Sequence, residues 1–216
     1  MEKGASKPTG TSSAGWRFNP TSETRLVTGN MIGTPIVGAT EVFLERNGPA
    51  AGASVVAALP QWREHLRPNT PALGLIGARK YPYPFIADLV RTMMHVTHVA
   101  DEDAFLREYA AAGIDRSMTT TMRTMLRFTR PEHLAARGQE SWRAFHDTGT
   151  VRVTIDGNDY MTRVTDWQRH EVIVCKIAME VRRRIFERMG LKLTMVRRER
   201  CVGWGHEDCV IRIRWT

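Results

Sequence analysis

The hydrophobic periodicity of the chain changes near Gly149. Before that residue, apolar residues recur every three or four positions, as in KYPYPFIADLVRTMMHVTH, which is typical of amphipathic helices. After it, the segment TVRVTIDGNDYMTRV alternates apolar and polar residues around an Asp-Gly-Asn-Asp turn, which predicts a β-hairpin. The sequence therefore predicts an α+β fold, with a helical N-terminal half packed on a C-terminal ββαββ antiparallel sheet unit.

Prolines, glycines and capping residues mark the ends of the expected helices in the first half. Pro84 suits the first turn of a helix that we expect to run to about residue 98. Asp101 is a good N-cap for the next helix, which we expect to end at Gly113. A further helix opens at Pro131, so the chain is expected to be almost wholly helical up to Gly149.

The second half contains the most regular helical stripe, in RHEVIVCKIAMEVRRRIFERMG, and Gly190 stands where a left-handed residue ends a helix. LKLTMVRRERC and CVIRIRWT predict two more strands. Residues 1–20 are rich in Ser, Thr, Gly and Pro, which predicts a disordered tail. We expect residues 30–216 to form a single domain, helical over 30–149 and ββαββ over 150–216.

The chain has 216 residues and a net charge of +8, from 31 Lys and Arg against 23 Asp and Glu. A basic balance favours acidic partners, but the arginines are spread along the chain and no nucleic-acid motif is present. A basic nucleic-acid-binding module is therefore kept only as a second alternative. No apolar run of about eighteen residues exists, so no membrane insertion is expected. The first residues lack the apolar run of a secretory signal, so we expect a cytoplasmic location.

Three cysteines are the main candidates for a metal site. Cys175 lies early on the long helix, Cys201 leaves one strand and Cys209 enters the next, so a hairpin would bring the last two together. In a reducing compartment an odd number of cysteines argues against a disulfide framework. Thiolates are preferred donors for structural zinc, and Glu199 and His206 are nearby candidates for a fourth ligand. The alternative is that all three cysteines are buried small apolar residues.

The run IVCKIAMEVRRRIFERMGLKLTMVRRERC, followed by GWGHEDCVIRIRW, resembles the C-terminal half of a known superfamily. It includes the haem nitric-oxide/oxygen-binding (H-NOX) domains, the 4-vinyl-reductase domain, sensor domains of aromatic-responsive transcription activators and the small TRAPP subunits. With ARKYPYPFIADLV and RFTRPEHLAARGQESWRAFHDTGTVRV, the likeness extends to a bacterial family of soluble proteins and covers most of residues 30–216. Several members bind zinc through such cysteines and a His or Glu three residues before the second one. Arg198 occupies that position here and cannot be a ligand.

The resemblance also raises the question of haem. In haem-binding members a proximal His lies just before the first strand of the hairpin, and a Tyr-x-Ser-x-Arg motif holds the propionates. Here Gly149 and Thr150 lie at about the proximal position, and His146 lies one helical turn earlier. YMTRV is similar to the propionate motif, but its Arg163 is one place early and the motif stands too far before Cys175. We therefore expect no haem, and keep as the alternative a haem-dependent gas sensor that uses His146.

The chain carries none of the common catalytic fingerprints, such as Gly-x-Ser-x-Gly, HExxH, a phosphate loop or a dinucleotide-binding loop, so we expect no enzymatic activity. We expect a sensory or interaction module that binds a small apolar ligand or a protein partner. The resemblance implies a pocket between the helical half and the sheet, and a homodimer paired through helices. The candidate pocket residues, whose alternative role is a closed core, are Phe85, Met93, Met94, Met122, Trp142, Phe145, His146 and Tyr160.

Overall fold

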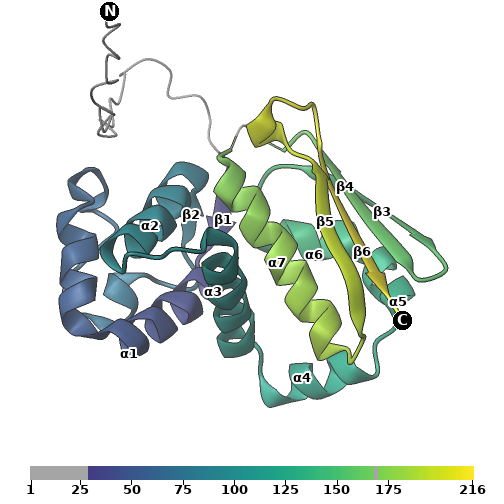
Figure 1. The fold of residues 1–216 in the computed structure, drawn as a ribbon, viewed down its shortest axis with the longest axis horizontal. Helices are drawn as coiled ribbons and strands as arrows, with labels where there is room; N and C mark the ends of the chain where they lie inside the picture. Colours follow the sequence, from purple (N-terminus) through teal and green to yellow (C-terminus); the bar gives the residue numbers. More distant parts are fainter. Residues whose placement is uncertain (1–28, 168–169) are drawn as a thin grey trace, which may run out of the picture.

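The structure is a computed structural model that describes residues 29–167 and 170–216. The tail expected over residues 1–20 lies outside this part of the chain. Figure 1 shows a helical half beside a four-stranded sheet, with a long helix lying across one face of the sheet. This is the predicted α+β arrangement. None of the helices in the described ranges combines the length and the apolarity needed to cross a membrane.

The helical half is built on three long helices and a short two-stranded sheet. Its elements are β1 (Asn30–Ile32), α1 (Thr34–Ala57), β2 (Lys80–Pro82), α2 (Tyr83–Val96) and α3 (Glu102–Ser117). Single 3-10 turns at Pro60–Trp62 and Pro71–Gly74 connect α1 to β2. The sequence did not predict the β1–β2 pair, because strands of three residues carry too few positions to display an alternating pattern.

Two of these helices, α1 and α3, show how local residues shape a helix and set its ends. The Asp101 side chain accepts a hydrogen bond from the Ala104 backbone N–H at 2.9 Å, as expected of an N-cap. Helix α1 contains a kink at Gly48, the glycine of the Asn47-Gly48 pair, whose φ is 78°. The prediction that α3 ends at Gly113 is wrong, because the helix continues to Ser117. Gly113 instead allows close helix contact, since a Cβ there would lie 2.4 Å from the Pro35 carbonyl oxygen.

Three short helices lead from the helical half to the sheet, namely α4 (Thr120–Arg127), α5 (Pro131–Ala136) and α6 (Gly138–Phe145). The single helix expected from Pro131 is therefore divided at Arg137. The turn after α6 is fixed by a hydrogen bond of 2.7 Å from the Trp142 indole N–H to the Thr148 carbonyl. Gly149 follows with a φ of 97°, a conformation that favours glycine.

The second half has the predicted ββαββ order, in β3 (Thr150–Asp156), β4 (Asp159–Thr165), α7 (Val172–Arg188), β5 (Leu193–Arg200) and β6 (Cys209–Trp215). The strands are antiparallel and lie in the order β3-β4-β6-β5, so β6 is an interior strand. Tyr160 pairs with Ile213 and Val164 with Cys209, which places these four side chains on the face that α7 covers. Gly190 follows the C-terminal end of α7 with a left-handed φ of 85°, as its position in the sequence predicts.

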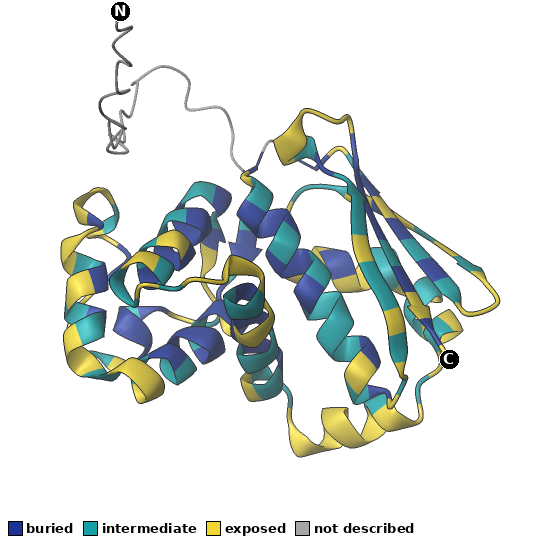
Figure 2. Cartoon of the chain, viewed as in Figure 1, coloured by how far each residue is buried: buried dark blue, intermediate teal, exposed yellow. Residues whose placement is uncertain are grey.

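The apolar core has two parts, and Figure 2 shows the buried surfaces of α2, α7 and the sheet that form them. The larger part joins the helical half to the beginning of α7 and includes all three cysteines. The smaller part lies between the other end of α7 and the sheet, where Phe186 packs against Tyr160 and Trp215. Helix α7 therefore contributes to both parts of the core.

Candidate metal centre and cavity

Four buried side chains form a cluster at the beginning of α7. The ligand atoms of His170, Cys175, Cys201 and Cys209 all lie within 4.8 Å of one another. The three cysteines have no exposed surface, and the Cys209 Sγ lies 3.7 Å from the His170 Nε2. Zinc bonds of about 2.0 to 2.3 Å place tetrahedral N and S donors roughly 3.5 to 3.8 Å apart. The donor types and their spacing therefore fit a tetrahedral metal ion.

Local structure explains why the four residues meet. Cys175 lies in the first turns of α7, while Cys201 directly follows β5 and Cys209 begins β6. The connection between these strands is a short 3-10 turn, Val202–Trp204, closed by Gly205 with a φ of 88°. The Val202 backbone N–H also donates to the Cys209 Sγ at 3.3 Å. This turn holds two of the sulfurs beside the helix that carries the third.

The fourth member of the cluster differs from the candidates that the sequence indicated. Glu199 lies on the outer face of the sheet, where it pairs with Arg197 and Arg212. His206 is exposed, and its Nδ1 lies 3.1 Å from the Cys201 carbonyl oxygen. Neither belongs to the cluster.

His170 takes the fourth place, which the sequence analysis did not predict. It lies just before α7 and is buried, with its ring centroid 3.8 Å from that of Trp167. Arg198, three residues before Cys201, donates to the Val172 carbonyl at 3.0 Å and lies over the Trp204 ring at 3.9 Å. The signal that could have identified His170 is its spacing of five residues from Cys175 at the start of a helix.

The thiols influence one another strongly. Hydrogen bonds from Cys175, then Cys209, lower the pKa of Cys201, and His170 contributes in the same direction. The hydrogen bond to Cys201 raises the pKa of Cys175, with Cys209 and burial adding to the effect. One thiolate thus forms readily in the cluster while its neighbours retain their protons. A cation is needed to hold several thiolates together here, because each buried negative charge is costly without one.

A cavity of about 160 Å³ lies beside this centre, between α3, α6, α7 and the inner face of the sheet. Ser141 and Phe145 line it and are also exposed, so the cavity reaches solvent beside α6. Its walls are mainly apolar and come from both halves of the molecule. The residues that line it include Met31, Ile36, Ile114, Ser141, Trp142, Phe145, His146, Tyr160, Thr162, Ile177, Ala178, Val181 and Arg182.

The structure brings only some of the candidate pocket residues to this cavity. Trp142, Phe145, His146 and Tyr160 line it. Phe85 and Met93 are fully buried in the larger core instead, and Met94 packs against the same core. Met122 lies on α4 with 51% of its surface exposed. Hydrophobic character alone could not distinguish these three environments.

His146 is held firmly at one end of the cavity. Its Nδ1 lies 3.0 Å from the Tyr83 hydroxyl, and its ring stacks on Trp142 with centroids 3.8 Å apart. The next residue, Asp147, accepts hydrogen bonds from the backbone and side-chain N–H groups of Asn30 at 2.6 and 2.7 Å. Burial, followed by the charges of Arg182 and His170, lowers the pKa of His146 well below its ordinary value. His146 is therefore neutral at pH 7.

The two tautomers of His146 give the cavity different chemistry. If the Tyr83 hydroxyl donates to Nδ1, the other ring nitrogen presents an N–H group. If Nδ1 donates to Tyr83, Nε2 presents a lone pair that can bind a metal. The Nε2 atom makes no hydrogen bond within the described part of the chain. Burial raises the pKa of Tyr83 to about 12, so its hydroxyl keeps a proton in either arrangement.

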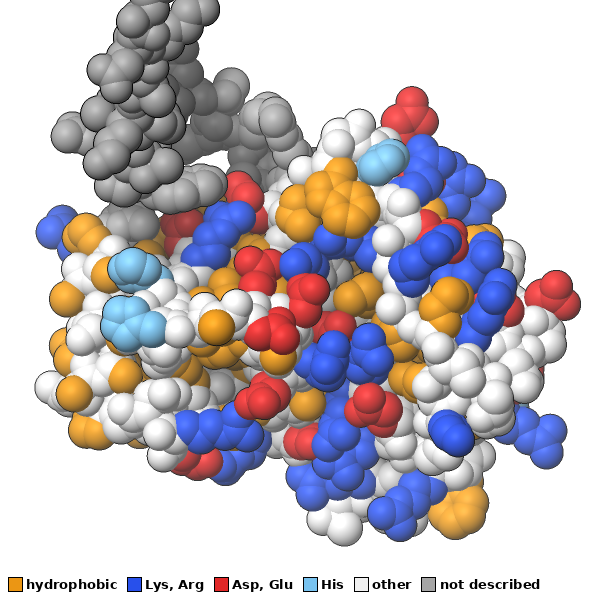
Figure 3. Space-filling model, viewed as in Figure 1, with side chains coloured by type: hydrophobic (Ala, Val, Ile, Leu, Met, Phe, Trp, Pro, Cys, Tyr) orange, Lys and Arg blue, Asp and Glu red, His pale blue; other side chains and the backbone are white. Residues whose placement is uncertain are grey.

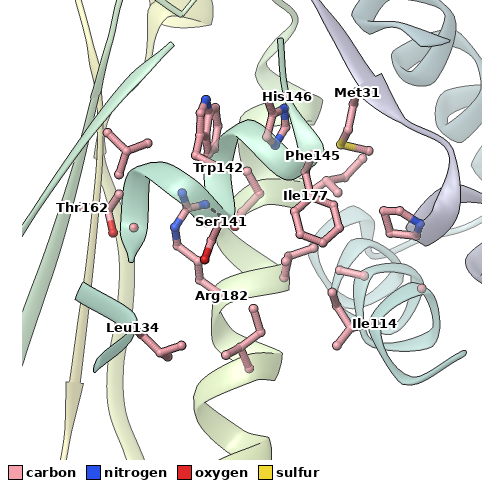
Figure 4. A pocket seen from close by; sticks show the side chains of 18 of the residues that line it. Met31, Ile114, Leu134, Ser141, Trp142, Phe145, His146, Thr162, Ile177 and Arg182 are labelled. Atoms are coloured by element: carbon pink, nitrogen blue, oxygen red, sulfur yellow. Dashed lines mark hydrogen bonds between the residues drawn. The ribbon is translucent and has the colours of Figure 1, made fainter. Parts of the chain in front are cut away.

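Two arginines decide which charges face this cavity. Arg163 points to the outer face of the sheet, where its Nε lies 2.5 Å from the buried carboxylate of Asp208. The YMTRV segment therefore turns its arginine away from the cavity. Arg182 instead reaches into the cavity from α7, below Trp142 in Figure 4.

The outer surface carries charges of both signs. Figure 3 shows Lys and Arg side chains interspersed with Asp and Glu on one face of the molecule. On the sheet, Arg212 and Arg214 both pair with Asp159. Neither the face seen in Figure 3 nor the outer face of the sheet therefore carries a continuous basic stripe of the kind that follows a nucleic-acid backbone.

Comparison with solved structures finds H-NOX proteins repeatedly. An H-NOX protein from S. oneidensis in the Fe(II) state matches with a TM-score of 0.60 and 10% identity, covering 85% of this chain and 96% of that one. An Fe(II) unliganded H-NOX protein from K. algicida matches with a TM-score of 0.59 and 12% identity, over 86% and 97% of the two chains. An oxygen-binding H-NOX domain related to soluble guanylate cyclases matches with a TM-score of 0.57 and 8% identity, over 86% and 95%.

The likeness lies in the fold and not in the amino-acid sequence. No family model matches the chain, and no curated protein matches it. Identities near 10% accompany coverage of most of both chains in each comparison. The chain therefore has an H-NOX-like α+β fold.

Proposed function

We propose that this chain is a non-catalytic sensory module whose cavity binds a small apolar ligand without haem. The observation that carries the proposal is the composition of the cavity wall. Met31 and Ile36 come from the helical half, whereas Trp142 and Ile177 come from the elements that cover the sheet. A ligand in this position contacts both halves, so its binding can change how they pack. Solved structures with this fold include an oxygen-binding H-NOX domain and an H-NOX protein in an Fe(II)NO state, so the fold can hold a small ligand.

The size of the cavity supports a small ligand. An apolar cavity of roughly 150 Å³ holds one benzene molecule, and the cavity here has a volume of about 160 Å³. The outward direction of Arg163 also supports the absence of haem, because the only arginine in the propionate-like segment does not face the cavity.

The ligand proposal is tested by titrating purified protein with benzyl alcohol, a neutral aromatic probe, while following tryptophan fluorescence. Ala178→Leu places additional side-chain volume in the cavity and should weaken binding at least about tenfold. Ala100→Leu makes the same change at an exposed position and should bind as the wild type does. Equal affinity in all three proteins, each shown to be folded by circular dichroism, would contradict the proposal.

A second candidate, a haem-dependent gas sensor, is favoured by His146. This residue lines the cavity, and Tyr83 fixes its ring with Nε2 left without a hydrogen bond in the described residues. Haem added to the purified protein should give no Soret band that depends on His146. A strong band that disappears in His146→Ala and persists in His133→Ala, a change at an exposed histidine, would favour the sensor with haem.

We further propose that zinc occupies the cluster of His170, Cys175, Cys201 and Cys209 as a structural ion. What supports zinc is the set of three thiolate donors and one imidazole in a buried, closed site. Elemental analysis of the purified protein should find about one zinc per chain. His170→Ala and Cys201→Ser should lower that content, whereas His206→Ala should not, because His206 lies outside the cluster. Zinc-free wild-type protein would leave the packing role of the cysteines as the explanation.

For the partner, we propose a second copy of the chain, docked at α4. Three large apolar side chains on or next to this helix, Met122, Met125 and Phe128, are 51%, 64% and 81% exposed. Exposed apolar groups of this size are typical of contact surfaces. Light scattering should therefore give the mass of a dimer for the wild type and of a monomer for Phe128→Glu. A wild type that remains monomeric at high concentration would contradict the homodimer.

A further inference from the structure

The arginines of α7 differ in their partners. Arg183 lies 2.7 Å from Glu180, and both Arg184 and Arg188 pair with Asp115, at 2.5 and 2.6 Å. Arg182 makes no ion pair with any residue in the described ranges. Its guanidinium donates one hydrogen bond there, from Nη1 to the Ala178 carbonyl at 2.9 Å, and lies 5.3 Å from the centroid of the Trp142 ring. Since a guanidinium has five N–H donors, most of those of Arg182 have no acceptor among the residues that the structure describes.

The position of Arg182 makes this lack of a partner informative. It lines the cavity, and none of the described residues that line the cavity is a carboxylate. Its surroundings are dense enough that burial lowers the pKa of the guanidinium. Arg182 is partly buried, and a cation without an anion is costly there, because the protein interior solvates charge poorly. An anion that enters the cavity would therefore gain both the ion pair and several hydrogen bonds.

A second polar group faces the same part of the cavity. Thr162 on β4 is only 1% exposed, and its hydroxyl has no hydrogen-bond partner in the described part of the chain. Thr162 lines the cavity from β4 and Arg182 lines it from α7, and Figure 4 shows both on the side of the cavity where Ser141 lies. A guanidinium and a hydroxyl on one side of the cavity form a site with two kinds of hydrogen-bond donor. The remaining walls are apolar, with Ile114, Phe145 and Ile177 among them.

We propose that this cavity binds a small apolar monocarboxylate, with the carboxylate on Arg182 and Thr162 and the apolar body against the isoleucine and aromatic walls. The proposal rests on the proposed function and names the class of ligand. A planar carboxylate accepts two parallel hydrogen bonds from one guanidinium, which suits a single arginine. A phosphate dianion fits less well, because no second cation lines the cavity among the described residues. The cavity volume of about 160 Å³ limits the apolar part to roughly one aromatic ring.

The test compares two probes of nearly equal shape, benzoate and benzyl alcohol, by isothermal titration calorimetry at constant ionic strength. Wild-type protein should bind benzoate at least about tenfold more tightly than benzyl alcohol. Arg182→Met should weaken benzoate binding roughly 10- to 100-fold and leave benzyl alcohol binding within about threefold. Thr162→Val should weaken benzoate binding a few-fold. Arg143→Met, a matched change at an exposed arginine on α6, should affect neither probe.

The thermal midpoint of Arg182→Met separates a lost contact from a lost fold. Removing a partly buried cation that has no ion-pair partner among the described residues should leave the midpoint unchanged or raise it. If benzoate bound Arg182→Met as tightly as wild type, or benzyl alcohol bound the wild type as tightly as benzoate did, the carboxylate assignment would be overturned. If Thr162→Val bound benzoate as the wild type does, Thr162 would not be part of the site.

The two proposals fail in different ways. If neither probe bound to the wild type, and Ala178→Leu changed nothing, the ligand-binding function itself would fail. If benzyl alcohol bound and benzoate did not, only the carboxylate assignment would fail. Haem is a second source of carboxylates, through its propionates. The small-ligand assignment would be overturned in favour of a haem propionate by the following combination of results. Haem would bind the wild type but bind Arg182→Met more weakly, the affinity of haem dimethyl ester would be the same for both proteins, and benzoate would not bind.

Discussion

Cys175 and Arg182 lie on the same face of α7, two helical turns apart. Seven residues separate them, which corresponds to roughly 10 Å along a helix. Cys175 belongs to the buried cluster of possible metal ligands, and Arg182 lines the cavity. A single rigid helix thus connects the two sites, so a change that loosens one end of α7 should alter the other.

Removal of the proposed zinc should therefore affect both stability and ligand binding. Treatment with a chelator is expected to lower the free energy of unfolding by at least about 2 kcal/mol, because structural zinc binds the folded chain and not the unfolded one. It should also weaken benzyl alcohol binding, because Cys175 no longer fixes the start of α7. Denaturant melts and fluorescence titrations before and after chelation measure both effects. Added zinc should restore the original values, and an unchanged denaturation midpoint would contradict a structural ion.

The buried His146 should make stability depend on pH. Burial, together with the charges of Arg182 and His170, lowers the pKa of His146 well below the ordinary value of 6.5. As the pH falls below 6.5, the unfolded chain binds a proton at this residue that the folded chain does not, so stability decreases. The loss approaches about 1.4 kcal/mol per pH unit for one proton.

Denaturant melts between pH 7 and pH 5 measure this loss. His146→Asn does not titrate in this range and should show a smaller decrease than the wild type. His133→Asn, at an exposed histidine, should retain the slope of the wild type. Equal slopes for His146→Asn and the wild type would show that another group causes the pH dependence.

Asp115 joins α3 to α7 and should stabilise the contact between them. Burial raises the pKa of its carboxyl, but hydrogen bonds from Arg188 and Arg184 outweigh burial and hold the pKa below its ordinary value of 3.8. Asp115→Asn should lower the free energy of unfolding by about 1–2 kcal/mol at pH 7. Because the pKa is lowered by folding, this difference should be constant above about pH 3.8 and shrink as the pH falls below that value.

The control for Asp115 is an exposed ion pair on the same helix. Glu108 pairs with Arg46, but the two side chains are 64% and 59% exposed. Glu108→Gln should therefore change stability by less than about 0.5 kcal/mol. If both variants lost the same amount of stability in urea melts, burial of the Asp115 pair would not explain its effect.

Gly113 should not tolerate a larger residue despite its helical position. Alanine is normally better than glycine inside a helix by about 1 kcal/mol. Here a Cβ would lie 2.4 Å from the Pro35 carbonyl oxygen, so Gly113→Ala should destabilise the protein by roughly 2–4 kcal/mol. At Gly77 a Cβ would come no closer than 3.4 Å to Thr34, so Gly77→Ala should be nearly neutral. Thermal melts of both variants and the wild type measure the two effects. A gain in stability for Gly113→Ala would contradict the close contact between α1 and α3.

Patterns of local spacing predicted the second half of the chain well. The alternation around Gly157 predicted the β3–β4 hairpin, and the stripe containing Val174 and Val181 predicted α7. The meeting of Cys201 and Cys209 followed from the same local logic, since a hairpin brings its two ends together. These features depend on residues that are near one another in the sequence.

Features that depend on long-range packing could not be predicted in this way. His170 meets the cysteines only because α7 lies across the sheet with its first turn beside the β5–β6 turn. Phe85 and Met93 fill the core of the helical half. This could not be predicted, because nothing in their hydrophobicity indicates whether they enter this core or line the cavity. Arg182 belongs to a run of three arginines that reads as a solvated surface, and only the tertiary structure separates it from its paired neighbours.

The order of the sheet also has a consequence for how the protein is made. During synthesis β4 emerges before β5, and β6 emerges after both, yet β6 lies between them. Residues Cys209–Trp215 must therefore have emerged from the ribosome before β5 can join the β3–β4 hairpin. Until then the nascent chain exposes open strand edges and lacks Cys209 of the buried cluster, a state in which molecular chaperones matter most. Truncation after residue 200 removes β6, the strand that joins β4 to β5, and should consequently be as damaging to folding as truncation within the helical half.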